Sequence, residues 1–160
     1  MLYERQRQWL PDEVDANPEH WEALTMQRIE RSGDWSASDI DFAVELHGRL
    51  VGAVQALRDF YKLPRRVYEL GIEFYDDADR GRGLGYQTLV QFVPDVFAAG
   101  AIRLQGRTHV ENTPMIRLFE RCGFVREGIL RDLGPLDGRS GDMAMYAMTR
   151  ADFAKSVLRR

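Results

Sequence analysis

The sequence predicts a mixed α/β fold in which helices flank one central β-sheet. Residues 67–74 are rich in β-branched and aromatic side chains, which is typical of a strand, and residues 87–99 then place apolar side chains at helical spacing. A second strand pattern at 101–110 is followed by a second helical pattern at 114–123. Strands that alternate with helices indicate a sheet covered by helices.

The elements before this region carry weaker signals. Residues 2–10 mix aromatic, apolar and basic side chains, and we interpret them as a short first strand, with a helical turn as the alternative. Pro18 follows Asn17 and is typical of the first position of a helix. Apolar side chains are then available for one face of that helix: Trp21, Leu24, Met26 and Ile29.

Two apolar-rich runs, 39–46 and 50–57, surround His47-Gly48 and predict a β-hairpin. Residues 31–38 and 58–66 are predicted to be loops. In the second half of the chain, Gly100 and Gly123 are expected to end the two helices. Two closing strands are predicted at 124–130 and 142–149, with a polar loop between them at 134–141.

Composition and charge exclude several classes of protein. With 160 residues, of which 44% are hydrophobic and 29% charged, residues 1–160 are expected to form one domain. The net charge of −3 gives no support for sequence-independent binding of nucleic acid. Cys122 is the only cysteine, which excludes an internal disulfide framework. No apolar run is long enough to span a membrane and no signal peptide is evident, so we expect a cytoplasmic protein.

The stretch that joins the strand at 67–74 to the following helix is a candidate phosphate-binding loop. It contains three glycines and two arginines: Arg80, Gly81, Arg82, Gly83, Leu84, Gly85 and Tyr86. Glycine lets the backbone approach a ligand, and N–H groups at a helix start attract anions. The P-loop pattern fails for lack of a lysine, and a dinucleotide fingerprint fails because Tyr86 replaces its third glycine. Nearby aspartates do not match the spacing of a calcium loop.

Two motifs resemble those of the GNAT superfamily of N-acetyltransferases. Arg80-x-x-Gly83-x-Gly85 is similar to the acyl-CoA-binding signature of that family, at its usual junction of strand and helix. The segment from Asn112 to Phe124, which contains Leu118-Phe119-Glu120, is similar to a second family motif. The residues after it, Arg126 to Asp132, resemble the branch that includes the RimJ and RimL ribosomal-protein N-terminal acetyltransferases.

The resemblance implies the GNAT fold and transfer of an acetyl group from acetyl-CoA to a primary amine by direct attack in a ternary complex. That fold has a mostly antiparallel mixed sheet whose two central strands are splayed at a bulge, with the co-substrate in the opening. Backbone N–H groups of residues 80–86 would bind the pyrophosphate, and no metal is expected. Five further residues would line the cofactor: Glu73, Phe74, Tyr75, Asn112 and Phe119.

The resemblance also suggests catalytic groups. Glu69 lies 14 residues before Gly83, the offset at which histone acetyltransferases of the superfamily carry their base, and Glu73 is the alternative on the same strand face. Pairing with an arginine is the other interpretation of Glu69. Phe119 stands where many members have a tyrosine acid, and Tyr146 or a water could replace it. Cys122 is expected to be a buried, inert thiol.

The acceptor stays open between a protein N-terminus and a small molecule such as a polyamine, an aminoglycoside or an amino acid. A non-catalytic acyl-CoA-binding module is the alternative function, favoured by Phe119 and opposed by Glu69. Dimers are common in the family, so a homodimer is one expectation.

Overall fold

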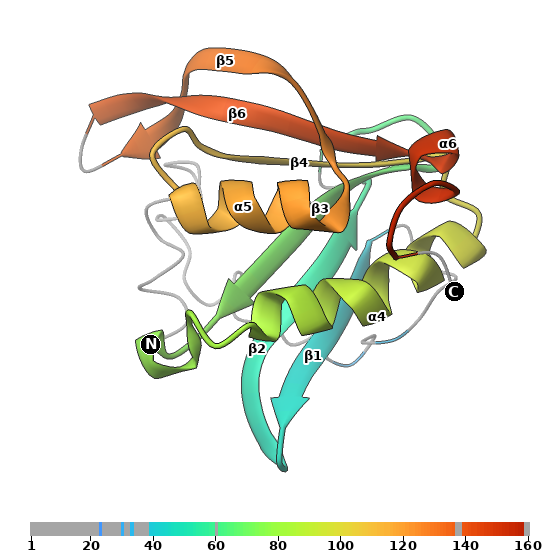
Figure 1. Ribbon diagram of the computed structural model, residues 1–160, viewed down its shortest axis with the longest axis vertical. Coiled ribbons are helices and arrows are strands. Elements are labelled where there is room, and N and C mark those ends of the chain that lie inside the picture. Colours follow the sequence, from blue (N-terminus) through green and yellow to red (C-terminus); the bar gives the residue numbers. More distant parts are fainter. Residues whose placement is uncertain are drawn as a thin grey trace.

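The computed structural model describes residues 39–59, 61–136 and 139–158, together with Ala23, Glu30 and Gly33. The strand predicted at 2–10 lies outside these residues. The helix predicted from Pro18 is described only at Ala23 and Glu30, and both are helical. The described strands form a six-stranded mixed sheet in the order β1-β2-β3-β4-β6-β5 (Figure 1).

The hairpin predicted at the start of the sheet is confirmed. β1 (Ile40–Leu46) pairs antiparallel with β2 (Arg49–Leu57). His47 and Gly48 join them with φ angles of 51° and 77°, and this left-handed pair matches the twist of a two-residue hairpin. β3 (Val67–Phe74) then pairs antiparallel with β2 and has the predicted bounds.

Two helices cover one face of the sheet. α4 (Leu84–Ala98) begins three residues before the predicted start, because Gly83 already caps it in the left-handed conformation. α5 (Thr113–Cys122) ends at Gly123, as predicted. Both helices lie on the same side of the strands in Figure 1. They bury apolar side chains against the sheet, including Leu89, Val93, Val96, Phe97 and Phe119.

The two central strands part from one another. β3 runs parallel to β4 (Arg103–His109), but the strands pair only from Val67↔Arg103 to Glu69↔Gln105. Beyond these pairs they diverge, and the sheet splits into the halves β1-β2-β3 and β4-β6-β5 (Figure 1). The predicted splay is therefore confirmed. The pairing of β2 with β3 contains no bulge and stays in regular register as far as Phe74.

The predicted polar loop at 134–141 is wrong. β5 (Val125–Leu136) and β6 (Arg139–Thr149) are long strands whose pairing continues through Gly134↔Gly141 to Leu136↔Arg139. β5 lies at the edge of the sheet, where its side chains from Val125 to Leu133 are exposed. A strand with both faces in water shows no apolar alternation, so its glycines and polar residues indicated a loop.

A last short helix, α6 (Arg150–Phe153), follows β6 near the end of the described residues. Thr149 caps it, and Arg150 donates to the carbonyls of Phe97 and Ala101 at 2.6 and 2.5 Å, at the end of α4. None of the helices described is long and apolar enough to cross a membrane.

Candidate active site

The glycine-rich loop lies between β3 and α4, as predicted. A short 3-10 turn, η2 (Asp77–Asp79), leads into it, and the side chain of Asp76 caps this turn by accepting from the N–H of Ala78 at 2.9 Å. Gly81 and Gly83 have φ angles of 71° and 79°, a conformation that other residues adopt at a cost. A Cβ at either position would have no described atom within 4 Å, so the space in front of both glycines is open.

Gly85 is required for a different reason. Its φ is not positive, but a Cβ there would lie 2.9 Å from Cδ2 of Leu118 on α5 and 3.8 Å from the ring of Phe74. The glycine therefore allows the first turn of α4 to approach α5. Next to it, Leu84 is half-buried, and the ring of Tyr86 lies 3.8 Å below the guanidinium of Arg121 on α5.

The start of α4 has the properties of an anion site. Among the residues that the structure describes, no side chain caps it, whereas Asn112 caps α5. Its first N–H groups lack intrahelical partners and carry the positive end of the helix dipole. Arg80 and Arg82 in the same loop have side chains 59% and 62% exposed. The loop thus offers N–H donors, two cations and open space.

The edge of β3 beyond the last paired residues is turned toward this opening. Tyr75 donates its N–H to the carbonyl of Val51 at 3.0 Å, so its backbone faces β2. Alternation then directs the backbone of Glu73 to β2 as well, and that of Ile72 and Phe74 to the opening. Arg80 donates to the carbonyl of Phe74 at 3.3 Å. Of the three predicted backbone contacts, Phe74 is the one whose groups face the opening.

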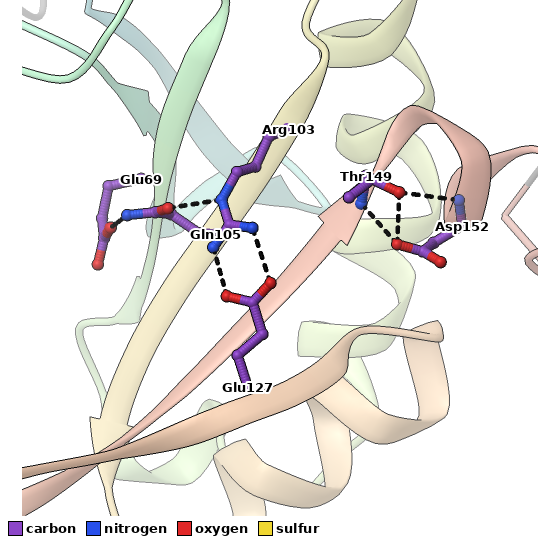
Figure 2. A network of polar contacts seen from close by, with 6 residues as sticks. All are labelled: Glu69, Arg103, Gln105, Glu127, Thr149 and Asp152. Carbon is purple, nitrogen blue, oxygen red and sulfur yellow. Dashed lines mark hydrogen bonds and ion pairs between the residues drawn. The ribbon is translucent and has the colours of Figure 1, made fainter.

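Glu69 lies at the point where β3 and β4 part, and it is 4% exposed. Its carboxylate accepts from Nε2 of Gln105 at 3.0 Å and from Nε of Arg107 at 2.7 Å. Figure 2 shows the Glu69–Gln105 hydrogen bond as one end of a chain of polar contacts. The chain continues from Gln105 through Arg103 to Glu127, with Arg103–Glu127 distances of 2.8 and 2.5 Å. The pairing of Glu69 with an arginine, the second interpretation from the sequence, is present: Arg107 holds Oε1 of the carboxylate, and Gln105 holds Oε2.

Phe119 and Tyr146 stack with their ring centroids 5.0 Å apart, and both are fully buried. The Tyr146 hydroxyl donates to Oε1 of Glu120 at 3.1 Å. Burial, and then this hydrogen bond, raises the pKa of Tyr146. Cζ of Phe119 would lie 2.7 Å from a Cβ on Gly106, and that Cβ would be 3.5 Å from the carbonyl oxygen of Leu70. The tip of Phe119 therefore points to the parting of the strands, and Tyr146 lies behind it.

Asn112 and a nearby cavity lie at the far end of β4. Oδ1 of Asn112 accepts from the N–H of Met115 at 3.3 Å, which leaves its Nδ2 group as the possible donor to a ligand. The cavity, of about 230 Å³, has three carboxylates among its lining residues: Glu111, Asp132 and Asp142. His109, which is 8% exposed, also lines it.

Several polar residues of this region were missed from the sequence. Gln105 and Arg107 hold Glu69, and Arg49 pairs with Asp79 just before the glycine loop. Polar side chains at 103, 105 and 107 alternate with Leu104 and Gly106, and this pattern could have indicated a polar face there. No local pattern connects residue 49 with residue 79.

A family model described as an acetyltransferase (GNAT) domain matches residues 3–125. Among curated proteins, the uncharacterized N-acetyltransferase p20 of Bacillus licheniformis is 27% identical over 88 residues, which cover 54% of this chain and about half (47%) of that protein.

Two solved structures illustrate the likeness of fold. RimJ of Mycobacterium smegmatis, in complex with CoA-disulfide, gives a TM-score of 0.72 at 21% identity, covering 86% of this chain and 65% of that one. A variant of the spermidine N-acetyltransferase SpeG of Vibrio cholerae gives 0.67 at 23% identity, covering 81% and 75%. At these identities the likeness establishes the fold, a mixed sheet flanked by helices.

Proposed function

The chain belongs to the GNAT family of acetyltransferases, and from this premise we propose that it transfers an acetyl group from acetyl-CoA to a primary amine, by direct attack in a ternary complex. The observation that carries this proposal is the position of the uncapped start of α4. It follows β3 in the chain, after η2 and the glycine loop, and the open edge of β3 begins where β3 and β4 part.

The glycine loop is proposed to hold the pyrophosphate. The open space in front of Gly81 and Gly83 fits a group that approaches the backbone, and the N–H groups at the start of α4 would donate to it. Arg80 and Arg82 supply positive charge at the rim. When bound, acetyl-CoA supplies an activated thioester whose carbonyl carbon accepts the amine.

The arm of the co-substrate is proposed to run back along β3 from the loop to Glu69. The backbone groups of Ile72 and Phe74, which β4 no longer pairs with, would form hydrogen bonds to the arm instead. Nδ2 of Asn112 would donate from the side of α5. The arm then ends near the tip of Phe119, at the parting of the strands.

Glu69 is proposed to take the proton of the attacking amine, directly or through a water. Its carboxylate lies where the strands part, and Gln105 and Arg107 keep it oriented. Glu73 is the alternative on the same face of β3. An α-amine, with a pKa of about 8, loses this proton more easily than a lysine amine, with a pKa of about 10.4.

The thiolate is proposed to leave without a strong protein acid. Phe119 has no proton to give. Tyr146 is the nearby hydroxyl, but to donate it would have to leave Glu120 and move past the ring of Phe119. A thiol with a pKa of about 8.5 gives a good leaving group, so early protonation contributes little. The C–N bond forms, the C–S bond breaks, and the proton goes to Glu69.

Free-thiol release from acetyl-CoA, measured with a panel of amines, tests this function. The panel contains Ala- and Ser-starting peptides, polyamines, aminoglycosides and amino acids. The solved relatives include RimJ and a spermidine acetyltransferase, and the acidic cavity beside β4 supports the inclusion of polyamines. Turnover with one class would identify the acceptor, whereas absence of acetyl-CoA binding in calorimetry would reject the function.

The Glu69→Gln variant tests the base. We expect kcat to fall most at low pH. The affinity for acetyl-CoA should stay nearly unchanged, because Glu69 lies on the face of the sheet opposite to α4, whose start is proposed to bind the pyrophosphate. An unaltered pH–rate profile would remove Glu69 from the mechanism, and Glu73→Gln would then be the next variant. Glu45→Gln, which removes an exposed carboxylate on β1, is the matched control.

A non-catalytic acyl-CoA-binding module is the second candidate. The observation that favours it is Phe119, a fully buried ring at a position that points to the opening and carries no hydroxyl. Tight binding of acetyl-CoA without turnover of any amine would support this candidate.

A further inference from the structure

A buried carboxylate lies immediately before the glycine loop. Asp79, the last residue of η2, is 1% exposed. Both of its oxygens accept from Arg49, with Nη1–Oδ2 at 2.9 Å and Nη2–Oδ1 at 2.6 Å. Arg49 is the first residue of β2, and its side chain is 55% exposed. This bidentate pair joins the hairpin to the loop across 30 positions of the sequence.

The charge of Asp79 matters because an anion is proposed to bind a few residues away. The Arg49 guanidinium, through its hydrogen bonds, holds the pKa of Asp79 below its usual range, so this carboxylate is ionised at neutral pH. An uncompensated carboxylate beside a phosphate site would repel the phosphates.

Asp79 also competes for a cation of the loop. Nη1 of Arg82 lies 4.0 Å from its Oδ1, farther than either nitrogen of Arg49. If Arg49 were absent, Arg82 would be the neighbouring cation left to balance Asp79, and it would be drawn away from the ligand. Arg80 lies in a similar pair, with Nη1 at 2.7 Å from Oδ1 of the exposed Asp77.

We propose that Arg49 is a positioning residue of the phosphate site, which cancels the charge of Asp79 and so leaves Arg82 available to the phosphates of the co-substrate. This inference rests on the proposed function. It assigns a role to a residue on β2, outside the loop and outside the helix that follows it.

Calorimetric titration of four proteins with CoA tests the inference: the wild type, Arg49→Gln, Asp79→Asn and the double variant. Arg49→Gln is expected to weaken CoA binding about tenfold, the size of one uncompensated charge near a partly screened site. Asp79→Asn is expected to bind as well as the wild type or better, and the double variant should match Asp79→Asn. A purely structural clamp predicts the opposite, because Asp79→Asn would then lose as much affinity as Arg49→Gln and would rescue nothing. That result would overturn the inference.

Further variants and ligands separate charge from folding. Arg49→Lys keeps the charge but loses the bidentate geometry, so if the charge carries the effect this variant should bind CoA within about twofold of the wild type. The KM for S-acetylpantetheine, which lacks the phosphates, should be the same in Arg49→Gln and wild type. High salt should reduce the tenfold difference in CoA affinity. A higher KM for S-acetylpantetheine in Arg49→Gln, or a loss of CoA affinity that does not change with salt, would contradict the charge mechanism.

The controls distinguish failure of the inference about Arg49 from failure of the proposed function. Arg58→Gln removes an ion pair at the other end of β2 and should bind CoA like the wild type. Circular dichroism confirms that each variant is folded. If the wild type does not bind CoA, the proposed function fails together with the inference. If the wild type binds and Arg49→Gln binds equally well, the inference alone fails.

Discussion

The close approach of Gly106 to Phe119 gives a sharp prediction about packing at the parting of the strands. An alanine Cβ at position 106 would lie 2.7 Å from Cζ and 3.1 Å from Cε1 of Phe119. Since ordinary contacts begin at 3.4 Å, the ring would have to retreat by about 0.7 Å. It has no room, because it is fully buried, stacked on Tyr146 at 5.0 Å and in contact with Phe124 at 5.2 Å between centroids.

Gly106→Ala should therefore lower the free energy of unfolding by about 1–3 kcal/mol, the usual cost of overpacking a core. Urea unfolding followed by circular dichroism measures this loss. Phe119→Leu removes the atoms that collide, so the double variant should lose less stability than the sum of the single variants, by about 1 kcal/mol or more. Gly128→Ala is the matched control: a Cβ there would have no described atom within 4 Å, and it should change stability by less than about 0.5 kcal/mol. A Gly106→Ala protein as stable as the control, or strict additivity with Phe119→Leu, would refute this reasoning.

Three further predictions concern single side chains. Phe119→Tyr would place a hydroxyl at the opening and should leave kcat for thiol release nearly unchanged, because early protonation of a good leaving group contributes little; a severalfold rise in kcat in a folded variant would show that protonation of the thiolate limits the rate. Thr149→Ala removes the cap of α6 and should cost about 1 kcal/mol at neutral pH. The Thr149 hydroxyl and N–H hold the pKa of Asp152 below its usual value, so the part of the stabilisation that comes from this carboxylate is present above about pH 4 and is lost as the pH falls through the lowered pKa. The bond from the N–H of Asp152 to the Thr149 hydroxyl does not titrate, so the difference in urea midpoint should shrink but not vanish at pH 2; an equal difference at pH 7 and pH 2 would contradict this reasoning. Burial raises the pKa of Cys122 to about 11, so the native protein should not react with a thiol reagent at pH 8, and rapid labelling would contradict its burial.

Much of the fold followed from local patterns in the sequence. β3 has the predicted bounds because its apolar run is flanked by polar turns, and the hairpin of β1 and β2 follows from His47-Gly48. The glycine loop was also predicted, because positions 81 and 83 need a left-handed backbone that glycine adopts easily. These features depend on residues close together in the chain.

The features that were missed depend on residues far apart. Arg49 meets Asp79 across 30 positions, and Arg107 meets Glu69 across 38. Each of these charges is common on a protein surface, so the sequence alone does not distinguish a buried pair from two solvated side chains. The extended hairpin of β5 and β6 was missed for a related reason, since an exposed edge strand needs no apolar pattern.

The two faces of the sheet support the proposed direct transfer over a covalent enzyme intermediate. Side chains alternate along β3, so Leu70 joins the helix-side core with Phe119, while Glu69 points to the opposite face with Gln105 and Arg107. Paired strands would separate these faces, but β3 and β4 part directly after Glu69. A thioester held along the open edge can therefore meet an amine that approaches from the side of Glu69. Cys122 lies in the helix-side core as a buried thiol with a raised pKa, so it is a poor nucleophile and has no such access.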